Sequence, residues 1–502
     1  MPLVASTLMM SGFDLRLLEL PQGAKVLRAP PPLPALADLP GAVQTALRHP
    51  VAGDPLSERL TASSRVTVVV DDFTFPVPQA QRDCRRELLA GVISALDACG
   101  VRSSRITVLI ANGLSRQWRP AELTELLGPV EPKVVCHDAE AFSQLARIGE
   151  LPEGPVELNK LVVEADLVIH LNVVSLPTLA GYFGLVSGTA GYRTARFLGA
   201  PGLFETGAAP FMPGSPYHAL HEKVGRLLAG RTEIVQLSAV LDNALVGSKL
   251  AGLEVPDAVL SRPLQMWNSL PVAVRQRAAR LLKASYRPFH VLFGDLDAVA
   301  PEARAAFARQ HEVPGEGEAD VLVFGVPDVG PGNIGTLQDP VLATCLALGY
   351  IAGVYTDRPL VREGGVVMFS NPLNPQFDRA HAPHQEFYEK VLRLERDPQA
   401  IHEKFEPYFA GRPEFVSGYQ SRFGFHGTHP LFQWYLTSPA RRRAGKVIVP
   451  YGDPRSCARL GFTPANDFED GLRKASEFLG QPAPRVLVLQ QPPPFWVRSG
   501  GA

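Results

Sequence analysis

The sequence predicts an α/β protein with two Rossmann-like domains, parallel-rich sheets and an interdomain cleft. Its length of 502 residues suits two or three domains. Short apolar, β-branched runs alternate with amphipathic helical segments in both halves, which is typical of parallel sheets covered by helices on both faces. The stretch 252–315, rich in Ala, Arg and Pro, resembles a helical connection. We therefore predict domains at 1–260 and 261–502.

The first half opens its strand series with the continuous apolar run Arg65–Val70. The helix expected next, about Gln81–Ala98, carries Val92 and Leu96 on one face and ends at Gly100. Further strands are expected at 106–110, 134–136 and 167–173, with a short helix that begins at Pro120.

The second half repeats this alternation. Asp320–Val326 is a predicted strand, and Asp339-Pro340 predicts a helix start, because it pairs a capping residue with proline at the first helical position. Later strands are expected at Gly365–Ser370, Lys446–Pro450 and Arg485–Leu489, with a helix at Asp467–Leu479.

Composition narrows the class of protein. The net charge of −1 gives no electrostatic reason to expect nucleic acid or an anionic membrane as partner. The five cysteines form no C-x-x-C pair and are odd in number, which favours a reducing compartment. The N-terminus lacks the basic region of a signal peptide. We expect a cytoplasmic protein with a small-molecule substrate; the sequence makes no prediction of the oligomeric state.

Ligands of open α/β sheets bind beyond the carboxyl ends of the strands. This rule selects the loops Asp71–Pro78, Asn112–Arg119, His137–Asp138 and the stretch after Val174. The first of them, DDFTFPVP, combines two carboxylates, a threonine and two prolines. It suits a rigid polar site loop, and it equally suits a turn whose side chains satisfy nearby backbone groups.

Several motifs in order resemble the nickel-dependent lactate racemase family. The loop DDFTFPVP is similar to its D-x-T-R-P-x-P motif, and AGYFG at Ala180–Gly184 resembles its A-G-F-S-G-G loop. The segments ELNKLVVEADLVI at Glu157–Ile169 and AVQTALRHPVAGDPLSERL at Ala42–Leu60 also resemble family segments, as does the closing helix and strand from LGFTPANDFEDGLRKASEFLG to RVLVL.

The resemblance implies a nickel-pincer nucleotide in the cleft and a racemase or epimerase-type isomerase of a small 2-hydroxy acid. It implies a lysine that holds the cofactor, a histidine that ligates nickel and two histidines that exchange a proton. The matching positions here carry other residues. Phe75 stands at the arginine of D-x-T-R-P, Ser115 and Pro177 at the two acid/base histidines, and Ser187 at the lysine.

Some family positions are retained, and they give the predicted contacts to cofactor or substrate: Asp72, Thr74 and Arg116. The nickel histidine lies in an N-P-x-H-E context in the family. His218 fits the spacing from the proline and His221 fits the following glutamate, and we favour His221 as the metal ligand. An exposed helical histidine with no ligand is the alternative.

Four histidines of the second half could replace the missing acid/base groups. HAPH supplies His381 and His384, and GFHGTHP supplies His426 and His429. We predict His426 and His429 as the catalytic pair, because the second domain closes the cleft. In the alternative interpretation, His429 caps the helix that Pro430 opens.

A second motif gives a different hypothesis. GPGNIG at Gly330–Gly335 follows a strand and matches G-x-G-x-x-G, with Asp357 further along, as in NAD-binding folds. The helix start at Pro340 lies too far from Gly335 for that fingerprint. Three functions therefore remain open: a divergent isomerase, a non-catalytic ligand-binding protein on the same fold, and an NAD-dependent oxidoreductase.

Overall fold

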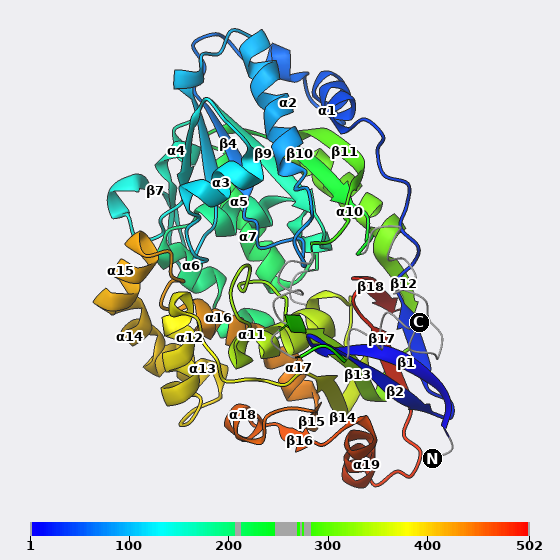
Figure 1. Cartoon of the computed structure of the whole chain (residues 1–502). Helices are drawn as coiled ribbons and strands as arrows, with labels where there is room; N and C mark the ends of the chain where they lie inside the picture. The colour runs from blue at the N-terminus through cyan, green and yellow to red at the C-terminus, as the bar shows by residue number, and fades with distance from the viewer. Residues whose placement is uncertain (1–2, 206–211, 246–268, 272–273, 276–282, 500–502) are drawn as a thin grey trace.

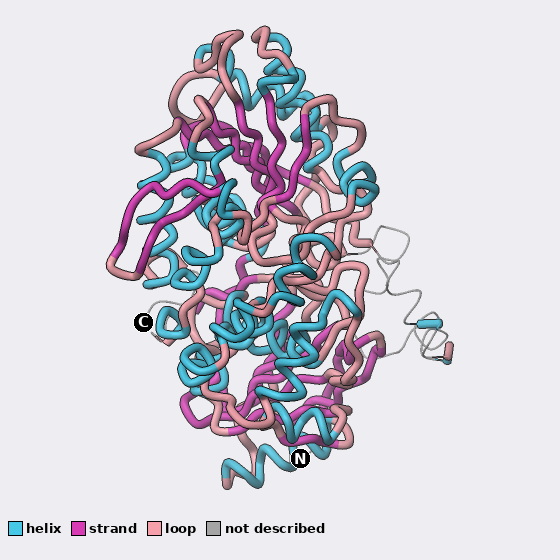
Figure 2. The backbone as a smooth tube through the Cα atoms, turned by 90° about the vertical axis from the view of Figure 1, so that its left-hand side faces the viewer, coloured by secondary structure: helices cyan, strands magenta, loops and turns pink. Residues whose placement is uncertain are grey.

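The computed structural model describes residues 3–205, 212–245, 269–271, 274–275 and 283–499. Two large sheets form its framework, one in the upper and one in the lower half of Figure 1. In Figure 2 the strands again form two groups, with helices packed around and between them. The predicted class, an α/β fold with parallel-rich sheets, is confirmed.

The first sheet has six strands in the order β11-β10-β9-β4-β5-β6. All neighbours pair in parallel except β10 and β11, which are antiparallel. The strands are β4 (Val66–Asp71), β5 (Ile106–Ala111), β6 (Lys133–Cys136), β9 (Leu167–Val174), β10 (Glu233–Leu241) and β11 (Pro288–Asp295).

Helices cover both faces of this sheet because successive side chains of a buried strand point to opposite faces. Val68 and Val70 pack into one hydrophobic cluster, and Val69 between them packs into another. Helices α1 (Leu39–Arg48) and α2 (Arg85–Ala98) contribute to the first cluster. Helices α4 (Lys160–Val163), α5 (Tyr182–Thr189) and α7 (Pro216–Ala229) contribute to the second.

The second sheet has eight strands and includes the N-terminal ones. At its centre β13 pairs in parallel with β14, β17 and the end of β1. The blue N-terminal strands therefore lie beside the red C-terminal strand β17 in Figure 1. The strands are β1 (Leu3–Gly12), β2 (Asp14–Pro21), β3 (Lys25–Arg28), β13 (Ala319–Pro327), β14 (Val361–Ser370), β15 (Lys446–Pro450), β16 (Thr463–Ala465) and β17 (Val486–Gln490).

The predicted domain boundary near residue 260 lies outside the described residues. The two sheets do not divide the chain at a single point, because each includes strands from the other side of residue 260. Residues 3–28 pair with the sheet of the C-terminal half, and β11 completes the sheet of the N-terminal half. The predicted connection at 252–315 also contains this strand and the long helix α10 (Leu296–His311). Pairing partners far apart in sequence decide these assignments, which local patterns do not reveal.

The remaining elements surround the two sheets. Two small sheets pair β7 (Leu145–Leu151) with β8 (Gly154–Asn159), and β12 (Glu312–Gly315) with β18 (Trp496–Ser499). The helices not yet named are α3 (Pro120–Leu127), α6 (Tyr192–Leu198), α11 (Pro340–Thr344), α12 (Ala382–Glu386), α13 (Pro398–Lys404), α14 (Glu406–Gly411), α15 (Pro413–Ser421), α16 (His429–Leu436), α17 (Ser438–Arg443), α18 (Pro454–Leu460) and α19 (Phe468–Leu479).

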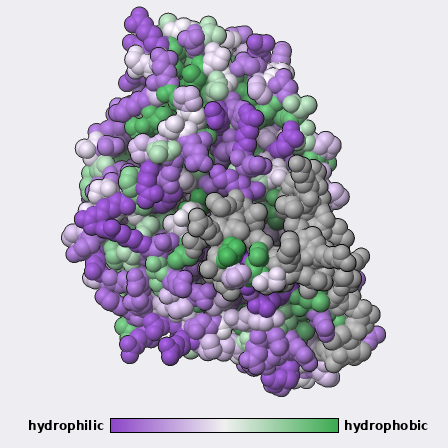
Figure 3. All heavy atoms as spheres, in the orientation of Figure 1, coloured by the Kyte–Doolittle hydropathy of each residue, from purple (hydrophilic) through white to green (hydrophobic). Residues whose placement is uncertain are grey.

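Among the described residues on the face shown in Figure 3, polar ones predominate, with apolar residues between them. Within the described part of the chain, none of the helices has the length and apolar character needed to cross a bilayer.

Direct contacts join the two halves beside the loops at the carboxyl ends of β5 and β6. His426 Nε2–H donates to the Glu140 carboxylate at 2.8 Å, and the Tyr419 hydroxyl donates to the carbonyl of Gly113 at 2.6 Å. Glu406 is fully buried and accepts hydrogen bonds from Tyr192 and from Arg196. These contacts hold the second half against the ligand-binding edge of the first sheet.

Candidate functional site

A cavity of about 250 Å³ lies between the two halves. The first half lines it with the loops that follow β4 and β5 and with helix α5, as the strand-end rule predicts. The second half lines it with Tyr350, from the π-helical segment η7 (Cys345–Val354), and with helix α16. The cavity is small against the roughly 300–1,000 Å³ of ordinary ligand pockets, so it suits a small molecule.

Asp72 and Thr74 both line this cavity, as predicted for ligand contacts. The Asp72 carboxylate accepts hydrogen bonds from the Thr74 hydroxyl and, at 2.6 Å, from the indole N–H of Trp118. Burial raises the pKa of Asp72 above its ordinary value, because the charged form loses water. The loop is thus a polar wall of the cavity with its carboxylate held in place.

Arg116, the third predicted contact, does not reach the cavity lining. Its guanidinium makes a bidentate pair with Glu122 at 2.9 and 3.0 Å, and it stacks over the ring of Trp118 at 4.3 Å. Trp118 in turn holds Asp72. Arg116 therefore contacts the site only indirectly: it stacks on Trp118, and Trp118 donates the hydrogen bond that holds the Asp72 carboxylate.

The positions that differ from the family motifs are partly brought together. Ser115 and Ser187 line the cavity from the first half, and Phe75 lines it while packing on Tyr350 with ring centroids 5.6 Å apart. Pro177 is not part of the lining. A serine hydroxyl does not act as a histidine-like base near neutral pH.

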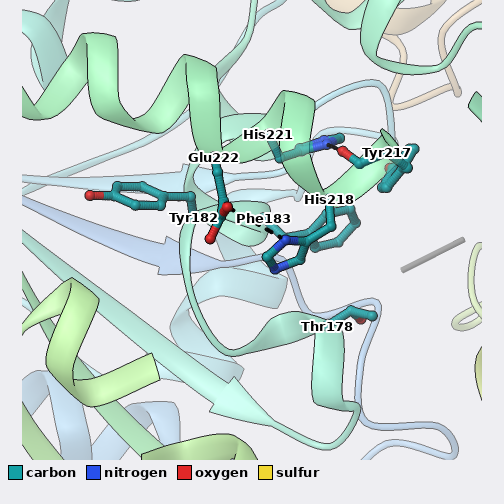
Figure 4. A pocket seen from close by; sticks show the side chains of 7 residues that line it. All are labelled: Thr178, Tyr182, Phe183, Tyr217, His218, His221 and Glu222. Carbon is teal, nitrogen blue, oxygen red and sulfur yellow. Dashed lines mark hydrogen bonds and ion pairs between the residues drawn. The ribbon is translucent and has the colours of Figure 1, made fainter. Parts of the chain in front are cut away.

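His221, the predicted metal ligand, lies on α7 one turn after Tyr217 (Figure 4). Its Nδ1–H donates to the carbonyl of Tyr217 at 2.8 Å, and its Nε2 accepts a hydrogen bond from the Ser187 hydroxyl at 2.8 Å. Burial lowers the pKa of His221 to about 4. His218, the alternative, points to Glu222 with 3.9 Å between Nδ1 and Oε2.

The implied nickel-pincer nucleotide can be tested against these residues. A neutral imidazole whose Nδ1–H is fixed by a carbonyl is a suitable metal ligand through Nε2. That nitrogen is occupied by Ser187, and the same Ser187 stands where the cofactor-linking lysine would be. Among the described residues, no group of three or more His, Cys, Asp or Glu side chains is placed to hold a metal ion. The residues therefore do not fit the covalently held cofactor.

The two predicted catalytic histidines have different surroundings. His429 lines the cavity as the first residue of α16, while the N-cap position falls to Thr428. His426 does not line the cavity. Both of its ring nitrogens are engaged, Nδ1 with Thr428 at 2.9 Å and Nε2 with Glu140 at 2.8 Å. Of the two, His429 is the one placed to reach a ligand in the cavity, and His426 forms a contact between the halves.

Sequence reasoning missed two cavity residues, Arg85 and Gln433. Arg85 is almost fully buried and donates to the carbonyls of Asp72 and Phe75 at 3.0 and 2.6 Å. These two hydrogen bonds fix the backbone of the Asp72–Phe75 loop. Gln433 lies one helical turn after His429, and its amide nitrogen is 3.4 Å from His429 Nε2. The i, i+4 spacing in the sequence was the signal for Gln433; nothing local singled out Arg85.

Acidification should destabilise the folded protein between about pH 6.5 and pH 4. Burial lowers the pKa to about 4 for His137, His221 and His311, and to about 3 for His429. An unfolded histidine binds a proton below about pH 6.5, so the unfolded chain binds more protons in this window. The unfolding free energy must then fall as the pH falls. Urea unfolding at pH 7.5, 6 and 5 measures this decrease in the unfolding free energy.

His311→Gln is the control for this pH effect. Glutamine can still donate to the carbonyl of Leu241, which His311 Nε2 contacts at 2.9 Å, but it does not titrate. The variant should show a shallower loss of stability with acid. Stability that stays constant from pH 7.5 to pH 5 would contradict the assignment of neutral buried histidines.

Comparisons with known proteins agree with this architecture. Residues 12–196 match the family model of the lactate racemase N-terminal domain. A lactate racemase from Thermoanaerobacterium thermosaccharolyticum is 30% identical over 146 residues, which span 28% of this chain and 33% of that protein. The sequence match therefore spans about a third of the length of this relative.

Solved structures share the fold along almost the whole chain. The lactate racemase apoprotein from the same organism has a TM-score of 0.65 at 17% identity, and the alignment covers 98% of this chain and 100% of that one. A protein from Thermotoga maritima has a TM-score of 0.51 at 12% identity, with coverage of 91% and 96%.

Fold and cavity together define a two-sheet α/β protein with a small cavity between its halves. Within this class, residues 12–196 are similar to the N-terminal domain of lactate racemase, and the chain shares the fold of the lactate racemase apoprotein. The resemblance noted in the sequence is confirmed.

Proposed function

We propose that this chain is a divergent lactate racemase-like isomerase that acts on a small 2-hydroxy acid in the cavity, with His429 as its proton-transferring residue. The observation that carries the proposal is the meeting of His429 with the Asp72–Thr74 loop in one cavity. That loop is the part of the site with the closest likeness to the family motif.

Two titratable side chains of the cavity lining, His429 and Asp72, have pKa values shifted in opposite directions. Burial lowers the pKa of His429 to about 3, so its imidazole is neutral and keeps a lone pair on one ring nitrogen. Burial raises the pKa of Asp72, while the hydrogen bonds from Thr74 and Trp118 act in the opposite direction. Pairs of groups whose pKa values are pushed apart are typical of acid/base sites. We assign His429 to exchange the substrate's hydroxyl proton, and Asp72 with Thr74 to hydrogen-bond the substrate. Inversion at the carbon would also require a bound hydride acceptor, because removal of the hydroxyl proton alone leaves the C–H bond intact.

A second candidate is ligand binding without turnover. It is favoured by Ser115 and Ser187, which replace a proton-transferring histidine and the cofactor-linking lysine in the same cavity. The family's nickel cofactor enters neither candidate as a step, because the residues do not fit its covalent attachment. We do not propose the NAD-dependent oxidoreductase. Gly335 lies several residues before the start of α11 at Pro340, so it is not in the first turn of the helix. The Asn333 side chain also hydrogen-bonds the backbone N–H of Gly330 and the carbonyl of Asp328.

The test measures interconversion of enantiomers. Purified protein, from cells with and without nickel-pincer nucleotide synthesis, is incubated with D- or L-forms of a panel of 2-hydroxy acids and assayed by chiral chromatography. Interconversion of one acid supports the isomerase. Saturable binding without interconversion in either preparation overturns it and supports the binding protein, and absence of binding overturns both. Nickel content and native mass of each preparation show which one carries the cofactor. The cytoplasmic location stays a prediction.

A further inference from the structure

Three imidazoles form a buried cluster behind the cavity. His381 and His384 are fully buried and His429 is 6% exposed. His429 Nδ1 lies 3.0 Å from His384 Nε2, and the rings of His381 and His384 pack with centroids 4.9 Å apart. Of the three, only His429 lines the cavity, so His384 and His381 lie behind it.

The other side of His429 faces Gln433, whose amide orientation is set by Cys345. The Cys345 thiol donates to Gln433 Oε1 at 2.6 Å, and burial raises the pKa of this thiol, which keeps it protonated. With its oxygen engaged by the thiol, Gln433 presents its NH₂ group to His429 Nε2 at 3.4 Å. An amide NH₂ is a donor, so His429 Nε2 must carry the lone pair.

These contacts select one tautomer of His429. Burial lowers the pKa of both His429 and His384, so both rings are neutral. A neutral imidazole with its lone pair on Nε2 carries its proton on Nδ1. His429 Nδ1–H then donates to His384 Nε2, which serves as acceptor. The basic nitrogen of His429 is therefore the one on the Gln433 side, and Gln433 itself lines the cavity.

His384 is held in turn by a rigid neighbour. His381 Nδ1 lies 3.2 Å from the Asp339 carboxylate, and His381 Nε2 lies 3.2 Å from the carbonyl of Gly332. Asp339 is fully buried, and its other oxygen caps α11 by accepting from the backbone N–H groups of Val341 and Leu342. A buried carboxylate fixed at a helix start anchors the ring against which His384 packs.

We infer that His384 and Gln433 are positioning residues that hold His429 in the Nδ1–H tautomer, with the Nε2 lone pair on the Gln433 side, where a ligand proton would take the place of the long Gln433 contact. The inference rests on the proposed function for its catalytic meaning, since it concerns the group that accepts the substrate's proton. Its structural content is independent of turnover, because a tautomer exists with or without a substrate.

The test is ¹⁵N NMR of the full chain labelled at histidine, with the His429 signals assigned by their loss in His429→Gln. The wild type should show His429 Nδ1 protonated and Nε2 unprotonated at pH 7. A protonated Nε2 in the wild type would overturn the inference, whatever the activity.

Two substitutions make the test sharper. Gln433→Glu replaces the donor by an acceptor, so the Nε2 signal should move to its protonated position. His384→Gln keeps an oxygen that accepts from Nδ1–H, so it should retain the wild-type tautomer, whereas His384→Phe should reduce its population. His290→Gln, in strand β11, is the matched control and should leave the His429 signals unchanged. An unchanged His429 tautomer in Gln433→Glu would overturn the positioning role.

Activity gives a separate readout if an interconverted acid is found. Gln433→Glu should lower kcat by roughly 10²-fold or more with KM little changed, because proton transfer and not binding is lost. His384→Gln should retain most of kcat. NMR results as expected, without interconversion of any acid, would uphold the positioning and reject the isomerase.

Discussion

Replacing His429 by glutamine should lower the rate of enantiomer interconversion by about 10²- to 10⁴-fold, the usual contribution of a general acid or base. Glutamine keeps a polar side chain of similar length but cannot exchange a proton near neutral pH. His429 is nearly buried and forms part of the cavity wall. The measurement is kcat/KM by chiral chromatography, with the melting temperature recorded for each variant.

His290→Gln serves as the control, because His290 lies in β11, away from the residues that line the cavity. It should retain the wild-type rate. His426→Gln separates the two histidines that the sequence proposed. Loss of turnover in His426→Gln but not in His429→Gln would show that the cavity residue is the wrong one. Equal, full activity of both variants would remove both from the reaction.

Replacing Asp71 by alanine should lower the unfolding free energy by about 1–3 kcal/mol, the usual cost of leaving buried hydrogen-bonding groups without a partner. Asp71 accepts hydrogen bonds from His170 Nε2 and from Asn172 Nδ2, both at 2.7 Å. His170 and Asn172 are fully buried in β9, so water does not replace the lost acceptor. Urea unfolding followed by circular dichroism measures the change.

Asp71→Asn is the graded comparison, since one amide oxygen can still accept a hydrogen bond, and it should cost less than Asp71→Ala. Asp97→Ala, at an exposed position of α2, is the surface control and should change stability by no more than about 0.5 kcal/mol. A cost for Asp71→Ala as small as that of the control would mean that the network of Asp71, His170 and Asn172 is not essential to the sheet.

The network also explains a glycine near the cavity. A Cβ atom on Gly184 of helix α5 would meet the Asp71 carboxylate at 2.3 Å. The helix therefore approaches the end of β4 closely only because residue 184 has no side chain. Gly184 belongs to the AGYFG motif that pointed to the family, and its physical role is this close approach.

The positions of the site loops were predictable because strand ends are visible in sequence. Val66–Asp71 and Ile106–Ala111 are continuous apolar runs, and their carboxyl ends meet at one edge of a parallel sheet. Asp72, Thr74 and Ser115 follow from that rule. Arg116 lies in such a loop too, but Glu122 and Trp118 engage it before it reaches the cavity.

The sequence by itself determined the α/β class, the positions of several buried strands along the chain and the likeness to lactate racemase. All three are carried by local signals: apolar runs of strand length, capped helix starts and motifs of neighbouring residues. Tertiary structure alone decided that the N-terminal strands join the C-terminal sheet and that His429, not His426, faces the cavity. The physical reason is that strand pairing and side-chain packing join residues hundreds of positions apart. Burial, tautomer and pKa are set by those distant partners.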